Sequence, residues 1–189
     1  SELLGADVWV KHENFQLLGA FKVRGGINLV SQSTQDELDR GFVTASSGNH
    51  GQSVAYAART FGAACTVVLP EGANSAKAGA IAALGAKVIF HGDVFERSRE
   101  LAEELAEKGG MRFVHAANEP ALVAGVATYS VEVHEELADI DFLFVPIGAG
   151  SGASGACIVT DSASPSTQVI GTQAAKAPAP RGNTAAFYP

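Results

Sequence analysis

The chain has 189 residues, of which 47% are hydrophobic and 17% charged, a composition typical of a globular protein rather than a disordered one. Its length allows one good hydrophobic core, or two small lobes that share one. The formal net charge of −7 provides no broad basic surface, so we expect no nucleic-acid partner. Cys65 and Cys157 lie in apolar stretches, and we expect buried thiols rather than a disulfide or a metal pair.

No stretch reaches 18 consecutive apolar residues, and the N-terminus lacks the pattern of a signal peptide. We therefore expect a cytoplasmic protein with no membrane partner. Because the chain opens on Ser1 rather than on a methionine, we also expect that some N-terminal sequence is missing.

Strand and helix patterns alternate along nearly the whole chain. An extended run is expected at residues 8–11, and a helix from about 21 to 30. Thr34 and Glu37 have the spacing of a capping box that begins a short helix. Further strands are expected at 41–45, 66–69, 87–90, 112–115, 142–147 and 168–171, and further helices at 51–61, 75–84, 95–108, 120–137 and 154–162. This alternation predicts an α/β fold with parallel sheets.

Ligands of such folds bind beyond the carboxyl ends of the strands, and three turns of unusual composition are expected there. The first turn leads to Lys22, which follows a turn glycine at the expected start of a helix. The positive end of the helix dipole disfavours a charged amine and is expected to lower the pKa of Lys22. Schiff-base chemistry needs such an amine, although most lysines at helix starts are merely solvated.

The second turn, residues 45–52, has the sequence Ala-Ser-Ser-Gly-Asn-His-Gly-Gln. Its backbone N–H groups would point at an incoming anion such as a carboxylate. An ordinary N-cap formed by Ser47 or Asn49 would explain the same residues, and His50 by itself is more typical of a structural histidine.

The third turn, residues 145–155, is rich in glycine and matches G-x-G-x-x-G from Gly150 to Gly155. Successive backbone amides in such a turn can bind a phosphate. The motif alone is weak, since a tight structural turn would need the same glycines.

Together and in this order, the three turns resemble those of the fold-type-II family of pyridoxal-phosphate (PLP) dependent threonine and serine dehydratases, which includes serine racemase and hydroxyaspartate dehydratase. Residues 11–26 are similar to the family's Schiff-base segment, Gly-Ser/Ala-Phe-Lys-x-Arg-Gly. Residues 45–52 resemble its Ser-x-Gly-Asn-His loop, and residues 145–155 its glycine-rich phosphate loop. The resemblance extends from about Val8 to Gly171.

The resemblance implies a fold like that of tryptophan synthase β, with two lobes that each contain a mostly parallel sheet flanked by helices. Residues 40–118 would form the smaller lobe. Residues 1–35 and 120–189 would belong to the larger, cofactor-binding lobe, which would be incomplete.

The resemblance also implies PLP as the cofactor and a role for each matching residue. Lys22 would form the Schiff base and then act as the base at Cα, Phe21 would back the cofactor ring, and Asn49 would hydrogen-bond its phenolic oxygen. The residues implied for the cofactor phosphate are Gly148, Ala149, Gly150, Ser151 and Gly152. Those implied for the substrate carboxylate are Ser46, Ser47, Gly48, Asn49 and His50.

The implied reaction is the dehydration and deamination of a small hydroxy amino acid, such as threonine or serine, to a 2-keto acid and ammonia by a homodimer. Serine racemase or hydroxyaspartate dehydratase activity is the nearest alternative, and in a racemase Ser47 would serve as a second acid/base. A nucleotide-binding module is an alternative of another class, but Thr172 and Gln173 stand where it needs an acidic residue. A third alternative is that the chain is a non-catalytic fragment. The histidines have no metal-ligand spacing, so we expect no metal.

Three positions depart from the family pattern, and none removes a catalytic group. Leu18 stands where threonine is frequent, Ser151 replaces a usual glycine, and Gly152 stands where a larger apolar residue is common. Relatives in the family also run considerably further, and residues 175–189 are rich in Pro, Ala and Gly. We therefore expect a chain truncated at its C-terminus, without the hydroxyl or thiol that would face the pyridine nitrogen.

Overall fold

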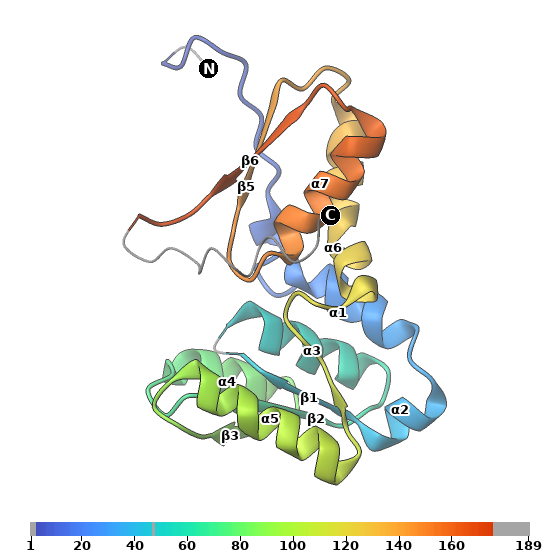
Figure 1. Ribbon diagram of the computed structural model, residues 1–189, viewed down its shortest axis with the longest axis vertical. Helices are drawn as coiled ribbons and strands as arrows, with labels where there is room; N and C mark the ends of the chain where they lie inside the picture. The colour runs from blue at the N-terminus through green and yellow to red at the C-terminus, as the bar shows by residue number, and fades with distance from the viewer. Residues whose placement is uncertain (1–2, 47, 176–189) are drawn as a thin grey trace.

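The computed structural model describes residues 3–46 and 48–175, and Figure 1 shows the arrangement of its elements. The helices are η1 (Glu13–Phe15), α1 (Lys22–Ser31), α2 (Gln35–Arg40), α3 (Asn49–Thr60), α4 (Ser75–Ala83), α5 (Phe95–Gly109), α6 (Pro120–Glu136) and α7 (Ser151–Ala163). The strands are β1 (Phe42–Ala45), β2 (Cys65–Leu69), β3 (Lys87–Phe90), β4 (Arg112–Phe113), β5 (Phe142–Pro146) and β6 (Gln168–Thr172).

The strands form two sheets, and every pair in them is parallel. The first sheet has the order β3-β2-β1-β4, with Phe42 opposite both Cys65 and Arg112. The second contains β5 and β6, with Phe142 opposite Gln168. Figure 1 shows the four-stranded sheet with α2–α5 at one end of the molecule, β5, β6, α6 and α7 at the other end, and α1 between them. The expected α/β fold with parallel sheets is confirmed.

Side chains of β1 and β2 are buried on both faces of the four-stranded sheet, as expected for central parallel strands. Phe42 and Val67 belong to the larger core cluster, which includes buried residues of α3 and α4. Their neighbours Val43 and Val68 point to the opposite face, where they pack with Ala102 of α5. The larger cluster continues through α1 and α6 to β5 and α7, so one core supports both sheets.

The helices that join the two sheets approach one another where glycines leave no side chain. A Cβ added to Gly26 of α1 would lie 2.7 Å from the carbonyl oxygen of Ser53 in α3. A Cβ added to Gly155 of α7 would lie 3.0 Å from the Cα of Ala127 in α6. These contacts bring α1 close to α3, and α7 close to α6.

Most expected elements are confirmed within a few residues, and so is the capping box. The Thr34 hydroxyl accepts a hydrogen bond from the Glu37 N–H at 3.3 Å, and the Glu37 carboxylate accepts one from the Thr34 N–H at 2.8 Å. The expectation for the cysteines holds in part, because both thiols are free but only Cys65 is buried, while Cys157 is half-buried.

Two expected elements differ in detail from those of the structure. Residues 8–11, expected as an extended run, belong to no strand among the described residues. The last helix, α7, begins at Ser151 rather than near Ser154, because Gly150 adopts φ = +105° and caps it three residues earlier.

No described helix is both long and apolar enough to cross a membrane. The tail expected to be a loop lies, from residue 176 on, outside the described residues.

Candidate active site

The N-terminal ends of α1 and α7 meet at Lys22 and Ser151. Each is the first residue of its helix. The Lys22 Nζ donates a hydrogen bond to the Ser151 Oγ and another, of 3.2 Å, to the carbonyl oxygen of Ala116. The fold thereby brings together residue 22, the loop after β4 and the loop after β5.

The amine of Lys22 is half-buried, and its burial lowers its pKa from 10.5 to about 8. The expected direction is confirmed, and its cause is burial of the amine, which sequence reasoning did not foresee. At pH 7 roughly one Lys22 amine in ten is therefore neutral, which is a far larger fraction than for a solvated lysine.

The loop between β5 and α7 runs directly into the N-terminal end of α7. Gly148 and Ala149 are exposed, whereas Gly150, Ser151 and Gly152 are buried. The positive φ of Gly150, which side chains disfavour, turns the chain so that its carbonyl accepts the Ser154 N–H at 2.9 Å and closes the first helical turn. The first N–H groups of a helix have no acceptor within it and favour an anionic partner.

Two aromatic residues hold this loop in place. The Tyr129 hydroxyl donates a 2.9 Å hydrogen bond to the carbonyl oxygen of Gly152. The rings of Phe21 and Tyr129 lie 5.7 Å apart between centroids, and a Cβ added to Gly152 would lie 3.1 Å from the Cζ of Phe21. Glycine at 152 therefore lets Phe21 pack against the loop. Sequence reasoning missed Tyr129, because no motif marks its position in α6.

The loop after β1 begins with a buried serine that organises the start of α3. The Ser46 Oγ accepts hydrogen bonds from the N–H of Gly48, at 3.2 Å, and of Gly51, at 2.9 Å. Gly48 is the N-cap of α3, and Asn49, its first residue, is exposed. Ser47, expected to bind the substrate carboxylate and to act as an acid/base, lies outside the described residues.

His50 is buried beneath this loop in a neutral form. Its Nε2 donates to the Thr44 Oγ1 at 3.0 Å and to the carbonyl oxygen of Val114 at 3.2 Å, since the Thr44 hydroxyl itself donates to that carbonyl. Burial, together with the nearby charge of Lys22, lowers the pKa of His50 to about 3. The Nδ1 is buried and has no hydrogen-bond partner among the described residues.

An ion-pair cluster holds the N-terminal segment against α1 and α6. The guanidinium of Arg24 donates two hydrogen bonds to the carboxylate of Glu13, at 2.8 and 3.0 Å, and two to that of Glu132, at 2.6 and 2.9 Å. Lys11 donates to the same Glu132 carboxylate. These hydrogen bonds, from Arg24 first and then Lys11, lower the pKa of Glu132 to about 2. Sequence reasoning missed the partners of Arg24, because they lie 11 and 108 residues away.

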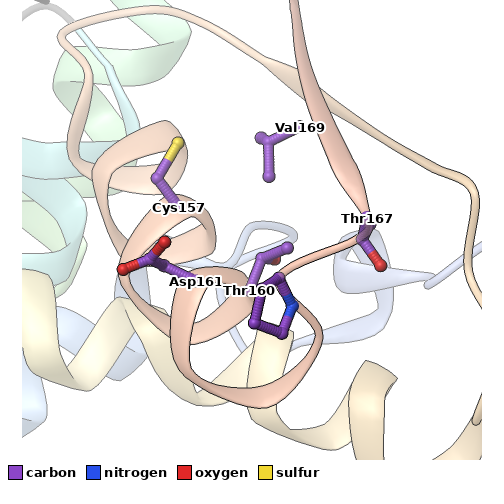
Figure 2. Close-up of a pocket in the computed structure, with 6 residues that line it drawn as sticks. Cys157, Thr160, Asp161, Thr167 and Val169 are labelled. Carbon is purple, nitrogen blue, oxygen red and sulfur yellow. The ribbon is translucent and has the colours of Figure 1, made fainter.

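A pocket with a volume of about 260 Å³ lies apart from these residues. Figure 2 shows residues that line it, between α7 and β6. The residues around it are Cys157, Thr160, Asp161, Pro165, Thr167 and Val169. No predicted site residue lines it, so it gives no support to the predicted site. Among the described residues there is also no group of three or more His, Cys, Asp or Glu side chains that could hold a metal ion.

The comparison with protein families decides the identity of the fold and the cofactor class. A family model described as pyridoxal-phosphate dependent enzyme matches residues 1–186. The chain belongs to this family. The match includes all three turns around Lys22, and the expected resemblance to PLP-dependent enzymes is thereby confirmed.

Similar proteins lie among the threonine ammonia-lyases and the racemases of the PLP-dependent family. An L-threonine ammonia-lyase of Thermotoga maritima is 40% identical over 178 residues, which is 94% of this chain and 44% of that protein. The processed form of threonine deaminase isoform 2 from Solanum lycopersicum superposes with a TM-score of 0.87 at 33% identity, over 91% of this chain and 47% of that one. Serine racemase from Dictyostelium discoideum superposes with a TM-score of 0.85 at 35% identity, over 93% of this chain and 57% of that one. The chain thus spans about half the length of these relatives, and its fold is that of fold-type-II PLP enzymes.

The described residues fit PLP, which carries an aldehyde and a phosphate. The amine of Lys22, which could bind the aldehyde, has a lowered pKa and contacts the first residue of α7 directly. The phosphate would be held by the turn that ends at Gly152, and the ring would lie near Phe21, whose side chain packs against the same turn. The two groups of the cofactor thus have matching partners in one place.

Proposed function

We propose that the protein is a PLP-dependent ammonia-lyase that removes the β-hydroxyl group and the amine of a small amino acid such as threonine or serine. The products are a 2-keto acid and ammonia. The observation that carries the proposal is the contact of the Lys22 amine with Ser151, because it brings a reactive amine to a phosphate-binding turn. Similarity to an L-threonine ammonia-lyase over 94% of the chain supports the same reaction.

In this proposal Lys22 has two tasks. Its amine would bind the aldehyde of PLP, and the same amine, when free and neutral, would take the proton from Cα. The cofactor, when bound, withdraws electrons from Cα and so makes that proton acidic. General-base catalysis of this kind typically accelerates a reaction by about 10²–10⁴-fold. A pKa of about 8 suits Lys22 for this task, because the neutral base is available near neutral pH.

The three loops supply the remaining contacts. The turn from Gly148 to Gly152 holds the cofactor phosphate, and Phe21 backs the ring. The turn from Ser46 to His50, which leads into α3, would hold the substrate carboxylate through its backbone amides. Asn49, the first residue of α3, would hydrogen-bond the phenolic oxygen of the ring. His50 contributes its backbone, because its side chain is buried and its Nε2 is already bonded to Thr44 and Val114.

Serine racemase activity is the second candidate, supported by the structural similarity to the racemase from Dictyostelium discoideum. Ser47 would then act on the face of the substrate opposite Lys22. Dehydration of hydroxyaspartate is a variant of the first proposal.

We further propose a homodimer in the cytoplasm, where the free thiols of Cys65 and Cys157 would stay reduced. In each chain of this homodimer, residues 40–118 would form the smaller lobe, and residues 1–35 and 120–189 would belong to the larger lobe.

The proposal is tested by incubating the chain with PLP and, separately, with L-threonine, L-serine and threo-3-hydroxyaspartate. We expect a 2-keto acid and an equal amount of ammonia from at least one of them, and none from the Lys22→Ala variant. Chiral chromatography of the serine sample detects a racemase through the appearance of D-serine. A folded chain that holds PLP on Lys22 but releases no keto acid from any of the three would contradict the elimination and leave the cofactor assignment standing.

A further inference from the structure

We propose that Ser151 is a positioning residue for Lys22, whose hydroxyl holds the lysine amine against the start of α7 before any cofactor is present. The inference deepens the proposed function, and only its consequence for the cofactor rests on that function. The contact itself is a property of this chain alone.

The geometry around the two residues carries the inference. Ser151 is 1% exposed, so its hydroxyl exchanges no hydrogen bonds with bulk water. Among the described residues its Oγ and the carbonyl oxygen of Ala116 are the two acceptors of the Lys22 Nζ. The backbone on both sides is fixed, by Gly150 as N-cap and by the bond from Tyr129 to Gly152. The position of the Ser151 backbone relative to Lys22 is therefore held from both sides.

The ammonium form of Lys22 is supported by its hydrogen bond to Ser151, by the one to Ala116 and by the ring of Phe21, whose centroid lies 5.5 Å from the Nζ. The titratable groups that face Lys22 are His50 of α3 and His115 in the loop after β4. Burial lowers the pKa of both, so neither carries a charge in the range where Lys22 titrates. Because a hydrogen bond to the charged form favours that form, Ser151 opposes the effect of burial on the amine.

The consequence for the cofactor follows from the chemistry of a hydroxyl group. Ser151 can accept from the Lys22 amine and at the same time donate to a phosphate oxygen at the start of α7. The same side chain would then join the amine that binds the aldehyde to the turn that binds the phosphate. Placement of the phosphate would thus keep Lys22 close to the aldehyde.

The test measures Lys22 directly in the chain without cofactor. Trace labelling of lysines with acetic anhydride across pH 6–10, followed by quantitative peptide mass spectrometry, gives the midpoint at which Lys22 becomes reactive. Lys77 and Lys87, which are exposed, serve as internal references. In Ser151→Ala we expect a lower midpoint than in the wild type and roughly two- to fivefold faster labelling of Lys22 at pH 7, because the ammonium has lost an acceptor.

Two further variants separate the hydroxyl from packing. Ser151→Gly also lacks the hydroxyl and should shift the midpoint in the same direction. Ser154→Ala is the matched control, since it removes a buried hydroxyl from the same helix that forms no hydrogen bond with Lys22 among the described residues. Circular dichroism and thermal unfolding confirm that each variant is folded.

A wild-type midpoint in folded Ser151→Ala and Ser151→Gly, or an equal shift in Ser154→Ala, would overturn the inference. A separate titration with PLP distinguishes this failure from failure of the proposed function. A midpoint that shifts as expected in a chain that takes up no PLP would keep Ser151 as the positioning residue and reject the cofactor role.

Discussion

Gly125 of α6 lies directly against Gly25 of α1, since a Cβ added to Gly125 would be 3.0 Å from the Cα of Gly25. The same added atom would be 2.5 Å from the carbonyl oxygen of Arg24. No side chain larger than hydrogen fits between the two helices at this crossing. Because α1 begins at Lys22, the crossing also fixes the direction from which the lysine reaches α7.

Replacing Gly25 with alanine should therefore destabilise the protein. The new methyl group would lie 2.7 Å from the carbonyl oxygen of Leu122 and 2.8 Å from the Cγ2 of Val126, so the helices must separate. We expect a loss of about 1–3 kcal/mol in the free energy of unfolding, measured with urea. Gly79→Ala in α4 is the control, because nothing lies within 4 Å of its added Cβ and alanine favours helix by up to about 1 kcal/mol. Equal effects of the two substitutions would show that the close crossing is absent.

The ion-pair cluster around Arg24 should contribute to stability more than an exposed pair does. Arg24→Met leaves the carboxylate of Glu13, whose side chain is 13% exposed, without its bidentate partner. We expect a loss of about 2 kcal/mol in the free energy of unfolding, less than for a fully buried pair because Glu132 is partly exposed. Arg97→Met, which breaks an exposed pair with Glu100, should leave the stability nearly unchanged. Similar losses in both variants would contradict a special role of the cluster.

The hydrogen bond from Tyr129 to Gly152 can be removed without changing the aromatic packing. Tyr129→Phe keeps the ring against Phe21 but leaves the Gly152 carbonyl without this donor. We expect a loss of about 1 kcal/mol in the free energy of unfolding and weaker binding of PLP, because the turn before α7 is less firmly held. In Tyr56→Phe the lost hydroxyl forms no hydrogen bond within the described residues, so both quantities should stay close to wild type. A Tyr129→Phe protein that binds PLP like the wild type would show that this bond does not shape the loop.

The buried, neutral His50 should make the fold sensitive to mild acid. Its pKa is lowered from 6.5 to about 3, so the unfolded chain takes up a proton below pH 6.5 that the folded chain takes up only near pH 3. Stability should therefore fall as the pH decreases through this window, by about 1 kcal/mol between pH 7 and 5.5 from His50 alone. His115, whose pKa is also lowered, contributes in the same direction.

Urea unfolding at pH 7 and 5.5 measures this dependence, with His50→Gln as the comparison. The amide can still donate to Thr44 but does not titrate, so the variant should lose less stability on acidification than the wild type, even where it is less stable at pH 7. An equal pH dependence in both proteins would mean that His50 is charged or exposed in the fold.

The local pattern of residues made most of the fold predictable. The alternation of strand and helix, the capping box of Thr34 and Glu37, and the helix start at Lys22 depend on neighbours within a few positions. The start of α7 was missed because the backbone of Gly150, rather than apolar spacing, begins that helix. Residues 8–11 have a strand-like composition but form no strand among the described residues, and Lys11 forms an ion pair with Glu132 of α6.

For the candidate site, the sequence predicted three turns and the roles of their residues, and these roles stay predictions. The contacts within the site could not be predicted. The bond from Lys22 to Ser151 joins residues 129 positions apart. Glu132, a partner of Arg24, and Tyr129, the donor to Gly152, lie on α6 with no local signal in the sequence. The cause of the lowered pKa of Lys22 was also hidden, because burial depends on the packed structure rather than on the start of a helix.

The most direct test of the account is whether PLP becomes attached to Lys22. The purified chain is incubated with PLP, reduced with borohydride and digested, and the peptide that carries the cofactor is identified by mass spectrometry beside the Lys22→Ala variant. We expect an absorbance band near roughly 410–420 nm that borohydride abolishes, with the label on Lys22 and none in the variant. A folded chain that gives no such band, or that carries the label on another lysine at the same level in both proteins, would contradict the assignment of Lys22 as the cofactor-binding residue.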